Sequence, residues 1–127
     1  MTGDDPIRMN RRILVCGSRD WPDAEAIFAR LLKEETGTNP PIIVHGAARG
    51  ADMMADAAAR ALGFPREAHP ANWTELGPRA GLLRNDEMLE SGVDLVIAFR
   101  LSHFSPGTNY TIKHARARGI PVEVYDW

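Results

Sequence analysis

The chain has a single cysteine, Cys16, among its 127 residues. One cysteine cannot form an intramolecular disulfide or supply the paired thiolates of a structural zinc site, so we expect a reducing, cytoplasmic compartment. The first ten residues include Asp4, Asp5 and Pro6, where a secretory signal needs an apolar stretch. No run approaches the roughly 18 apolar residues of a membrane span. A membrane partner is therefore not expected.

An excess of positive charge is also absent. Lys and Arg total 15 against 17 Asp and Glu, which gives a formal net charge of -2, and the basic residues form no run. Proteins that bind nucleic acids draw much of their affinity from basic groups that neutralise phosphates. The composition thus argues against a nucleic-acid partner and is compatible with a small anionic ligand held by a few placed groups.

Two common nucleotide-binding motifs are missing. The turn Gly17-Ser18-Arg19 lacks the G-x-G-x-x-G spacing, and no acidic residue follows at the end of the second predicted strand, which disfavours a dehydrogenase-type dinucleotide site. There is no G-K-[ST] sequence for a P-loop. Neither Cys16 nor any serine has a neighbouring base that the sequence identifies, so nucleophilic catalysis has no support.

What the sequence does contain is an alternation of short apolar runs with longer segments of helical spacing, which is typical of consecutive β-α units. The pattern predicts an α/β fold, a Rossmann-like three-layer sandwich around a mostly parallel five-stranded sheet of order 3-2-1-4-5. Residues 1–10 are predicted to be a loose tail and residues 11–127 a single domain. The predicted strands are 13–16, 42–45, 66–69, 94–99 and 121–125.

Helices are predicted between these strands. Apolar residues recur at three- and four-residue spacing from Ala24 to Leu32, and helices are also expected at 51–62, 78–90 and 108–118. The strand at 66–69 is polar and suits a sheet edge. The segment between it and residue 78 is predicted to be a loop.

Three turns between a strand and the following helix carry the candidate ligand-binding residues. Such turns expose unpaired N–H groups at the positive end of a helix dipole, where phosphate or carboxylate binds well. In the predicted strand order, the first and third turns face each other across one crevice, and the second borders it. The candidates are Gly17, Ser18 and Arg19 in the first turn, Gly46, Ala47, Arg49, Gly50 and Asp52 around the second, and Ser105, Gly107 and Thr108 in the third.

Three further positions, together with Asp52, each fit more than one role. Asn85 falls on an apolar helical stripe and needs a polar partner if it is buried, and the adjacent Arg84 suits phosphate recognition or a solvated helix face. Trp73 fits either packing at the end of the core or stacking on a base. Asp52 fits either a ribose contact or stabilisation of its own helix start. No metal and no cofactor are expected, because the separations of the histidines match no metal signature.

Taken together, these motifs resemble the YspA-like, YpsA-related branch of the SLOG superfamily, over residues 12–124. The resemblance rests on Gly17-Ser18-Arg19-Asp20-Trp21, His45-Gly46-Ala47-Ala48-Arg49-Gly50-Ala51-Asp52, Ala71-Asn72-Trp73, Ala80-Gly81, Arg84-Asn85 with Met88, Ala98-Phe99 and Ser105-Pro106-Gly107-Thr108. It implies a Rossmann-like domain that binds a nucleotide or nucleotide-derived ligand at the glycine-rich turns. Relatives commonly form dimers, so it also implies a homodimer.

The superfamily includes LOG-type phosphoribohydrolases, molybdenum-cofactor carriers and the DNA-processing protein DprA. The leading hypothesis is a ligand-sensing or ligand-handling module. The alternative is a LOG-like nucleotide N-glycosidase with Arg84 as its catalytic arginine, and the third is single-stranded nucleic-acid binding like that of DprA. The resemblance to LOG enzymes is broken after Gly107-Thr108, where Asn109, Tyr110 and Thr111 follow and no glutamate is present.

Overall fold

The computed structural model describes residues 10–102 and 104–127. Its strands are β1 (Arg12–Gly17), β2 (Ile42–His45), β3 (Arg66–Ala68), β4 (Leu95–Arg100) and β5 (Val122–Asp126). Its helices are α1 (Ala24–Leu32), α2 (Ala51–Leu62), α3 (Trp73–Leu76), the short 3-10 helix η1 (Gly77–Arg79), α4 (Ala80–Glu90) and α5 (Pro106–Ala117). Most of these elements lie within two residues of the predicted positions.

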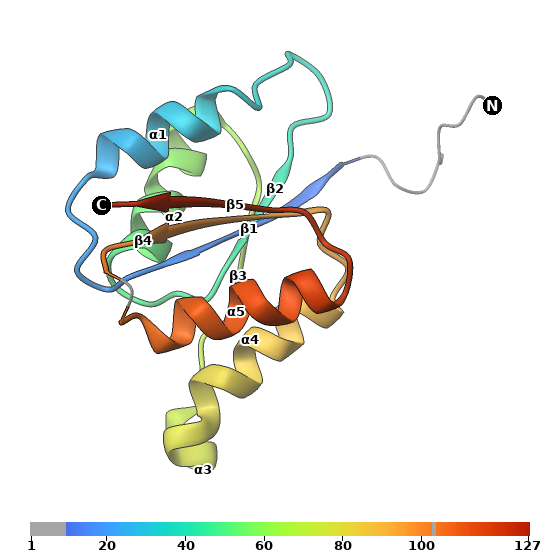
Figure 1. The fold of residues 1–127 in the computed structure, drawn as a ribbon. Helices are drawn as coiled ribbons and strands as arrows, with labels where there is room; N and C mark the ends of the chain where they lie inside the picture. The colour runs from blue at the N-terminus through green and yellow to red at the C-terminus, as the bar shows by residue number, and fades with distance from the viewer. Residues whose placement is uncertain (1–9, 103) are drawn as a thin grey trace.

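All five strands are parallel, in the order β3-β2-β1-β4-β5. The predicted α/β fold class and strand order are therefore confirmed. Helices α1 and α2 cover one face of the sheet, and α4 and α5 cover the other (Figure 1). Because the order reverses between β1 and β4, the loops that follow these two strands leave the sheet side by side.

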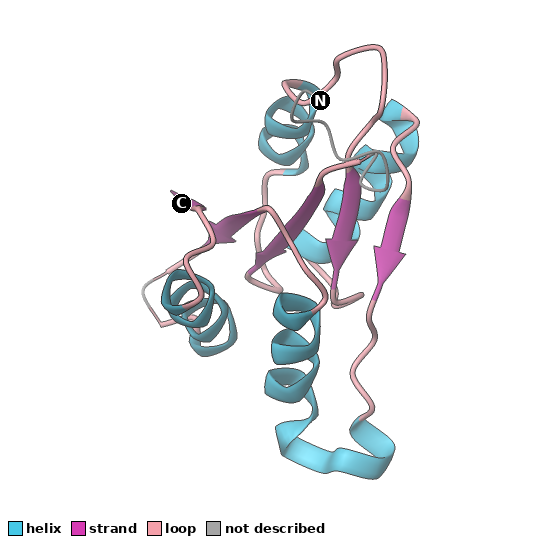
Figure 2. Ribbon diagram, turned by 90° about the vertical axis from the view of Figure 1, so that its right-hand side faces the viewer, coloured by secondary structure: helices cyan, strands magenta, loops and turns pink. Residues whose placement is uncertain are grey.

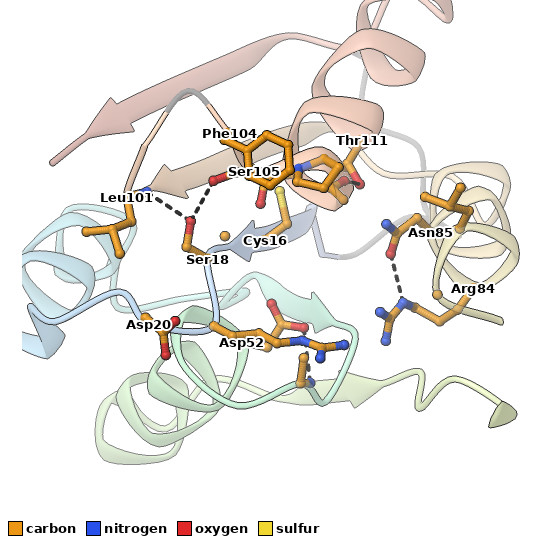
Figure 3. A pocket seen from close by; sticks show the side chains of 18 of the residues that line it. Cys16, Ser18, Asp20, Asp52, Arg84, Asn85, Leu101, Phe104, Ser105 and Thr111 are labelled. Atoms are coloured by element: carbon orange, nitrogen blue, oxygen red, sulfur yellow. Dashed lines mark hydrogen bonds between the residues drawn. The ribbon is translucent and has the colours of Figure 1, made fainter. Parts of the chain in front are cut away.

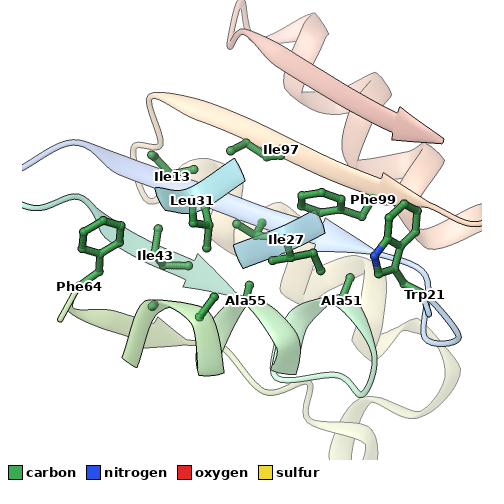
Figure 4. Packing of buried hydrophobic residues seen from close by; sticks show 13 residues of the cluster. Ile13, Trp21, Ile27, Leu31, Ile43, Ala51, Ala55, Phe64, Ile97 and Phe99 are labelled. Carbon is green, nitrogen blue, oxygen red and sulfur yellow. The ribbon is translucent and has the colours of Figure 1, made fainter. Parts of the chain in front are cut away.

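The core has two parts, one on each face of the sheet. On the α1 and α2 face, Ile13, Ile43 and Ile97 pack against Ile27 and Leu31, as Figure 4 shows. On the other face, Leu14, Val44 and Val96 pack against α4 and α5. Strands covered on both faces are expected to be apolar along their length, which explains the continuous hydrophobic runs in the sequence.

The structure differs from the prediction between β3 and α4. Residues 73–76 were predicted to be loop but form α3, followed by η1, and both lie beyond the end of the sheet in Figure 2. Asn72 caps α3, because its Oδ1 accepts a hydrogen bond from the Glu75 N–H at 3.2 Å. An asparagine three residues before a glutamate is a helix-start signal that the sequence analysis missed.

Of the predicted tail, residues 1–9 lie outside the described part of the chain, and Asn10 donates a hydrogen bond to the Pro40 carbonyl. No helix within residues 10–102 and 104–127 combines the length and the apolar character needed to cross a bilayer.

Candidate functional site

A cavity of about 630 Å³ opens where the loops after β1 and β4 meet. The two strands are hydrogen-bonded neighbours, and the Ser18 N–H donates to the Phe99 carbonyl at 2.9 Å. The Oγ atoms of Ser18 and Ser105 lie 3.0 Å apart. Figure 3 shows these residues on one side of the cavity, with Arg84 and Asn85 of α4 on the other. The structure thus brings together the first and third turns singled out in the sequence.

A chain of hydroxyl groups joins these two turns. The Ser105 Oγ donates to the Ser102 carbonyl at 2.9 Å, so its lone pairs are the groups left to face Ser18. Ser18 therefore donates to Ser105, and its own Oγ accepts the Leu101 N–H at 2.9 Å. Since each hydroxyl proton has a defined acceptor, these serines hold the cavity wall together.

The second turn, after β2, uses most of its amides internally. The Asp52 carboxylate accepts from the Gly46 N–H at 3.1 Å and from the Ala48 N–H at 3.2 Å, and the Ala47 N–H donates to His45 Nδ1 at 3.0 Å. Asp52 thus fills a nest of backbone donors in which a ligand anion could otherwise sit. Of this turn, Ala48 and Asp52 line the cavity.

Arg84 is held by backbone carbonyl groups. Its Nη1 donates to the carbonyl of Gly46 and, at 3.3 Å, to that of His69, while its Nε donates to Asn85 Oδ1 at 2.7 Å. A Cβ on Gly46 would lie 2.4 Å from Nη1, so only glycine leaves room for the guanidinium. Its Nη2 donates to no acceptor in the described part of the chain.

Two polar side chains that are at least nine-tenths buried line the cavity from α4 and α5. Asn85 is 9% exposed, and because its Oδ1 accepts from Arg84, its NH₂ group is left for the cavity. Thr108 is 7% exposed, and its hydroxyl has no partner among the described residues. Its N–H belongs to the first turn of α5, where no intrahelical acceptor is available. Both residues therefore offer unused donors to the same space.

Trp73 forms part of the outer wall. It is 49% exposed, it lies against Gly81 of α4, and the Arg19 guanidinium is 5.9 Å from its ring centroid. Its ring is half open to solvent beside the cavity, so it does not close the end of the core. Arg49 pairs with Asp20 at 3.2 Å on the surface, where such a pair contributes little to stability.

Burial is the largest cause of the pKa shifts of the ionisable groups that line the cavity. Burial raises the pKa of Asp52, opposed by the Ala48 N–H, the charge of Arg84 and other donors. Burial lowers the pKa of Arg84, opposed by the charge of Asp52. Burial also raises the pKa of Cys16 well above its ordinary value, so this residue is a neutral thiol at pH 7. Asp52 and Arg84 thus stabilise each other's charged form at the wall of the cavity.

The predicted site residues divide into two groups. Those that line the cavity are Gly17, Ser18, Arg19, Asp52, Trp73, Arg84, Asn85, Ser105, Gly107 and Thr108. Gly46, Ala47, Arg49 and Gly50 do not line it. At Gly50, an added Cβ would lie 2.3 Å from the Arg19 carbonyl oxygen, so this glycine is needed for the approach of two chain segments.

Sequence reasoning missed several lining residues, among them Gly81, Leu82 and Thr111. Gly81 and Leu82 belong to the start of α4, which runs along the cavity. Their helical spacing to Arg84 and Asn85 was the available signal. Thr111 is fully buried, and its hydroxyl donates to the Gly107 carbonyl at 3.2 Å.

The histidines do not form a metal site within the described residues. His45 contacts Asp56, and His69 contacts Glu67, but no group of three His, Cys, Asp or Glu side chains that could hold a metal ion occurs in residues 10–102 and 104–127. His103 lies outside the described residues.

The fold is a Rossmann-like α/β domain, and this cavity lies at its topological switch point. The model of the family described as YspA, cpYpsA-related SLOG matches residues 11–75. The Gene 61 protein of Mycobacterium phage D29 is 42% identical over 119 residues, which cover 88% of this chain and 94% of that protein. The chain therefore belongs to the YspA, cpYpsA-related SLOG family.

A solved structure supports the same architecture. DNA processing protein A (DprA) from Streptococcus pneumoniae superposes with a TM-score of 0.74 over 93% of this chain, at 19% sequence identity. The match covers 52% of the DprA chain, so this protein spans about half the length of that relative. At this identity, the likeness shows a shared fold.

Proposed function

We propose that the cavity binds a nucleotide or a nucleotide-derived small molecule, and that the protein is a ligand-sensing or ligand-handling module. The observation that carries the proposal is the convergence of unused donors from two helices on one cavity. Asn85 of α4 offers its NH₂ group there, and Thr108 of α5 offers its hydroxyl and N–H. Donors without protein acceptors favour a ligand rich in oxygen or nitrogen acceptors.

The anionic part of the ligand is assigned to the start of α5. The N–H groups of Gly107 and Thr108 lie at the positive end of the helix dipole, where a phosphate is stabilised. A Cβ on Gly107 would meet no atom within 4 Å, so no contact in the protein requires glycine here. Close approach of a ligand to the backbone gives this glycine a role.

The planar part of the ligand is assigned to the apolar wall. Trp73, Leu82 and Met88 line the cavity, and Trp73 and Leu82 are each at least 40% exposed. A base that packs on Trp73 would gain stacking and remove this surface from water. The volume of about 630 Å³ lies within the range of about 300–1,000 Å³ typical of small-molecule sites.

The N-glycosidase alternative has one observation in its favour, the Asp52 carboxyl group. It lines the cavity, and burial raises its pKa, a combination often found in catalytic acids and bases. Against this role, both Asp52 hydrogen bonds to the β2 turn come from backbone N–H groups that hold the carboxylate in place.

The test is thermal melting of the full chain with AMP, GMP, CMP, UMP, ATP and NAD, beside adenosine and inorganic phosphate as partial ligands. A ligand at about 100 times its Kd adds about 2.7 kcal/mol to the free energy of unfolding. We expect at least one nucleotide to raise Tm more than adenosine or phosphate does. Chromatography of the same mixtures separates binding from hydrolysis, since release of free base would favour the N-glycosidase. A short single-stranded oligonucleotide is added to the panel to test the third hypothesis. A rise in Tm with the oligonucleotide alone, or no rise with any compound, would contradict the proposal.

A further inference from the structure

His45 is 1% exposed and is not among the cavity-lining residues, yet it contacts the turn that holds Arg84. Its Nδ1 faces the Ala47 N–H at 3.0 Å, and its Nε2 faces Asp56 Oδ1 at 2.8 Å. An amide N–H can only donate, so Nδ1 must accept. The imidazole is therefore neutral, with its proton on Nε2, and it donates that proton to Asp56.

The peptide unit between Gly46 and Ala47 connects this imidazole to Arg84. In a trans peptide, the N–H and the C=O point in opposite directions. Here the N–H points to His45 Nδ1, and the C=O of the same unit accepts from Arg84 Nη1. One rigid plane thus has the imidazole on one side and the guanidinium on the other.

This peptide is held in a strained conformation. Ala47 has a φ of +59°, in the left-handed region that a residue with a Cβ rarely adopts. Such a conformation persists only where surrounding contacts enforce it. Within the described residues, the hydrogen bonds to His45 and Arg84 are the contacts that hold the two ends of the plane.

We propose that His45 positions Arg84 in the ligand site through the Gly46–Ala47 peptide, and that protonation of His45 flips this peptide and releases Arg84. If Nδ1 were protonated, its N–H and the Ala47 N–H would point at each other, and neither donor would have an acceptor. A flip turns the Gly46 carbonyl toward Nδ1–H and away from Arg84, and it carries Ala47 out of the left-handed region. The pH control of ligand affinity rests on the proposed function, whereas the link between His45 and Arg84 does not.

The charged and ionisable groups around His45 come from three elements. Asp52 and Asp56 face it from α2, Arg66 reaches it through Asp56 at 3.0 Å, and Arg84 approaches from α4. His69, which follows β3, donates its N–H to the His45 carbonyl. Since the Nε2–H already donates to Asp56, protonation of the ring adds its proton at Nδ1, which keeps the bond to Asp56 and breaks the bond to Ala47.

Two variants separate the two hydrogen bonds of the His45 ring, the one with Ala47 and the one with Asp56. In His45→Asn, the side-chain oxygen lies near the position of Nδ1 and can still accept from Ala47. In His45→Gln, the side-chain NH₂ lies near the position of Nε2 and can still donate to Asp56, but the acceptor for Ala47 is lost. By ¹H–¹⁵N NMR of the full chain without ligand, we expect His45→Asn to keep the Arg84 Nε–H signal at neutral pH. We expect His45→Gln to lose it and to speed exchange of the Ala47 N–H about tenfold. Equal behaviour of the two variants would overturn the positioning role.

A titration of the wild-type chain decides the matter even if a variant fails to fold. We expect the His45 ring nitrogens, the Ala47 N–H and the Arg84 Nε–H to change along one curve as pH falls, and AMP affinity to fall with them. If His45 titrates while the Arg84 signal stays unchanged, or if the ring stays neutral until the chain unfolds, the switch is refuted. Coupled NMR signals with no binding of AMP or any other nucleotide tested would refute the proposed function alone.

Discussion

The Arg84 guanidinium lies in the space that a side chain at Gly46 would occupy, with Nη1 2.4 Å from the ideal Cβ position. The same Nη1 donates to the Gly46 carbonyl. Gly46 does not line the cavity itself. Because it has no side chain, Arg84, which does line the cavity, can contact the Gly46 backbone.

Gly46→Ala should displace Arg84, because the end of a flexible side chain yields more easily than the backbone. We expect the free energy of unfolding to fall by about 1–2 kcal/mol, from loss of the hydrogen bonds to two carbonyls. Arg84→Ala removes the guanidinium from the cavity wall and should lower nucleotide affinity, and Gly46→Ala should lower it equally. Calorimetry on Gly46→Ala, Arg84→Ala and the double variant measures both the free energy of unfolding and the nucleotide affinity. If the effects of the two substitutions add fully in the double variant, Gly46 acts independently of Arg84.

Ser18→Ala should weaken the contact between the loops that follow β1 and β4. It removes both the acceptor for the Leu101 N–H and the donor to Ser105, and a buried donor left unpaired is costly. We expect a loss of about 1–3 kcal/mol in urea denaturation. Ser102→Ala is the matched control. Among the described residues, the Ser102 Oγ bonds only to Phe104 in its own exposed turn, so this variant should change stability by less than half as much.

Thr108→Val and Thr111→Val should separate binding from folding on one helix. The Thr108 hydroxyl has no partner in the described part of the chain, so the isosteric valine should leave the ligand-free Tm unchanged or slightly higher while nucleotide affinity falls about 3- to 12-fold. The fully buried Thr111 hydroxyl donates to the Gly107 carbonyl, so its valine variant should lower Tm. Unchanged affinity in Thr108→Val would remove this hydroxyl from the site.

The fall in the free energy of unfolding at acid pH should depend in part on Glu67 of the edge strand β3. The bidentate hydrogen bond from Arg12 lowers its pKa to about 2, against the effect of burial. Because the folded-state pKa lies below the ordinary value of 4.5, the stabilisation is complete above pH 4.5 and is lost as pH falls toward 2. Urea melts of Glu67→Gln should therefore show a weaker dependence on pH in this window. An unchanged slope would exclude this ion pair as a source of acid sensitivity.

The sheet order could be predicted from sequence because its determinants are local. Apolar runs such as 13–16 and 94–99 mark strands buried on both faces, and the single reversal of a right-handed fold then fixes which loops meet. The contact between Ser18 and Ser105 follows from that order.

The use of each backbone donor could not be predicted from sequence. The turn after β2 has the same glycine-rich character as the other two, but Asp52 folds back onto its amides. Whether a carboxylate caps its own turn or faces a ligand depends on a few backbone angles, including the left-handed Ala47. The role of Gly46 likewise depends on Arg84, which lies 38 residues away in the chain.

In the proposed complex, Thr108 and Asn85 supply donors to one bound nucleotide. A ¹H–¹⁵N NMR titration of the full chain with the nucleotides named above tests it most directly. We expect at least one nucleotide to shift the Gly107 and Thr108 amides and the Asn85 NH₂ signal along a single saturating curve, while the amides of Arg12 and Ile42, at the opposite ends of β1 and β2 from the cavity, stay in place. No shift with any nucleotide, or shifts confined to that opposite end of the sheet, would contradict this binding mode.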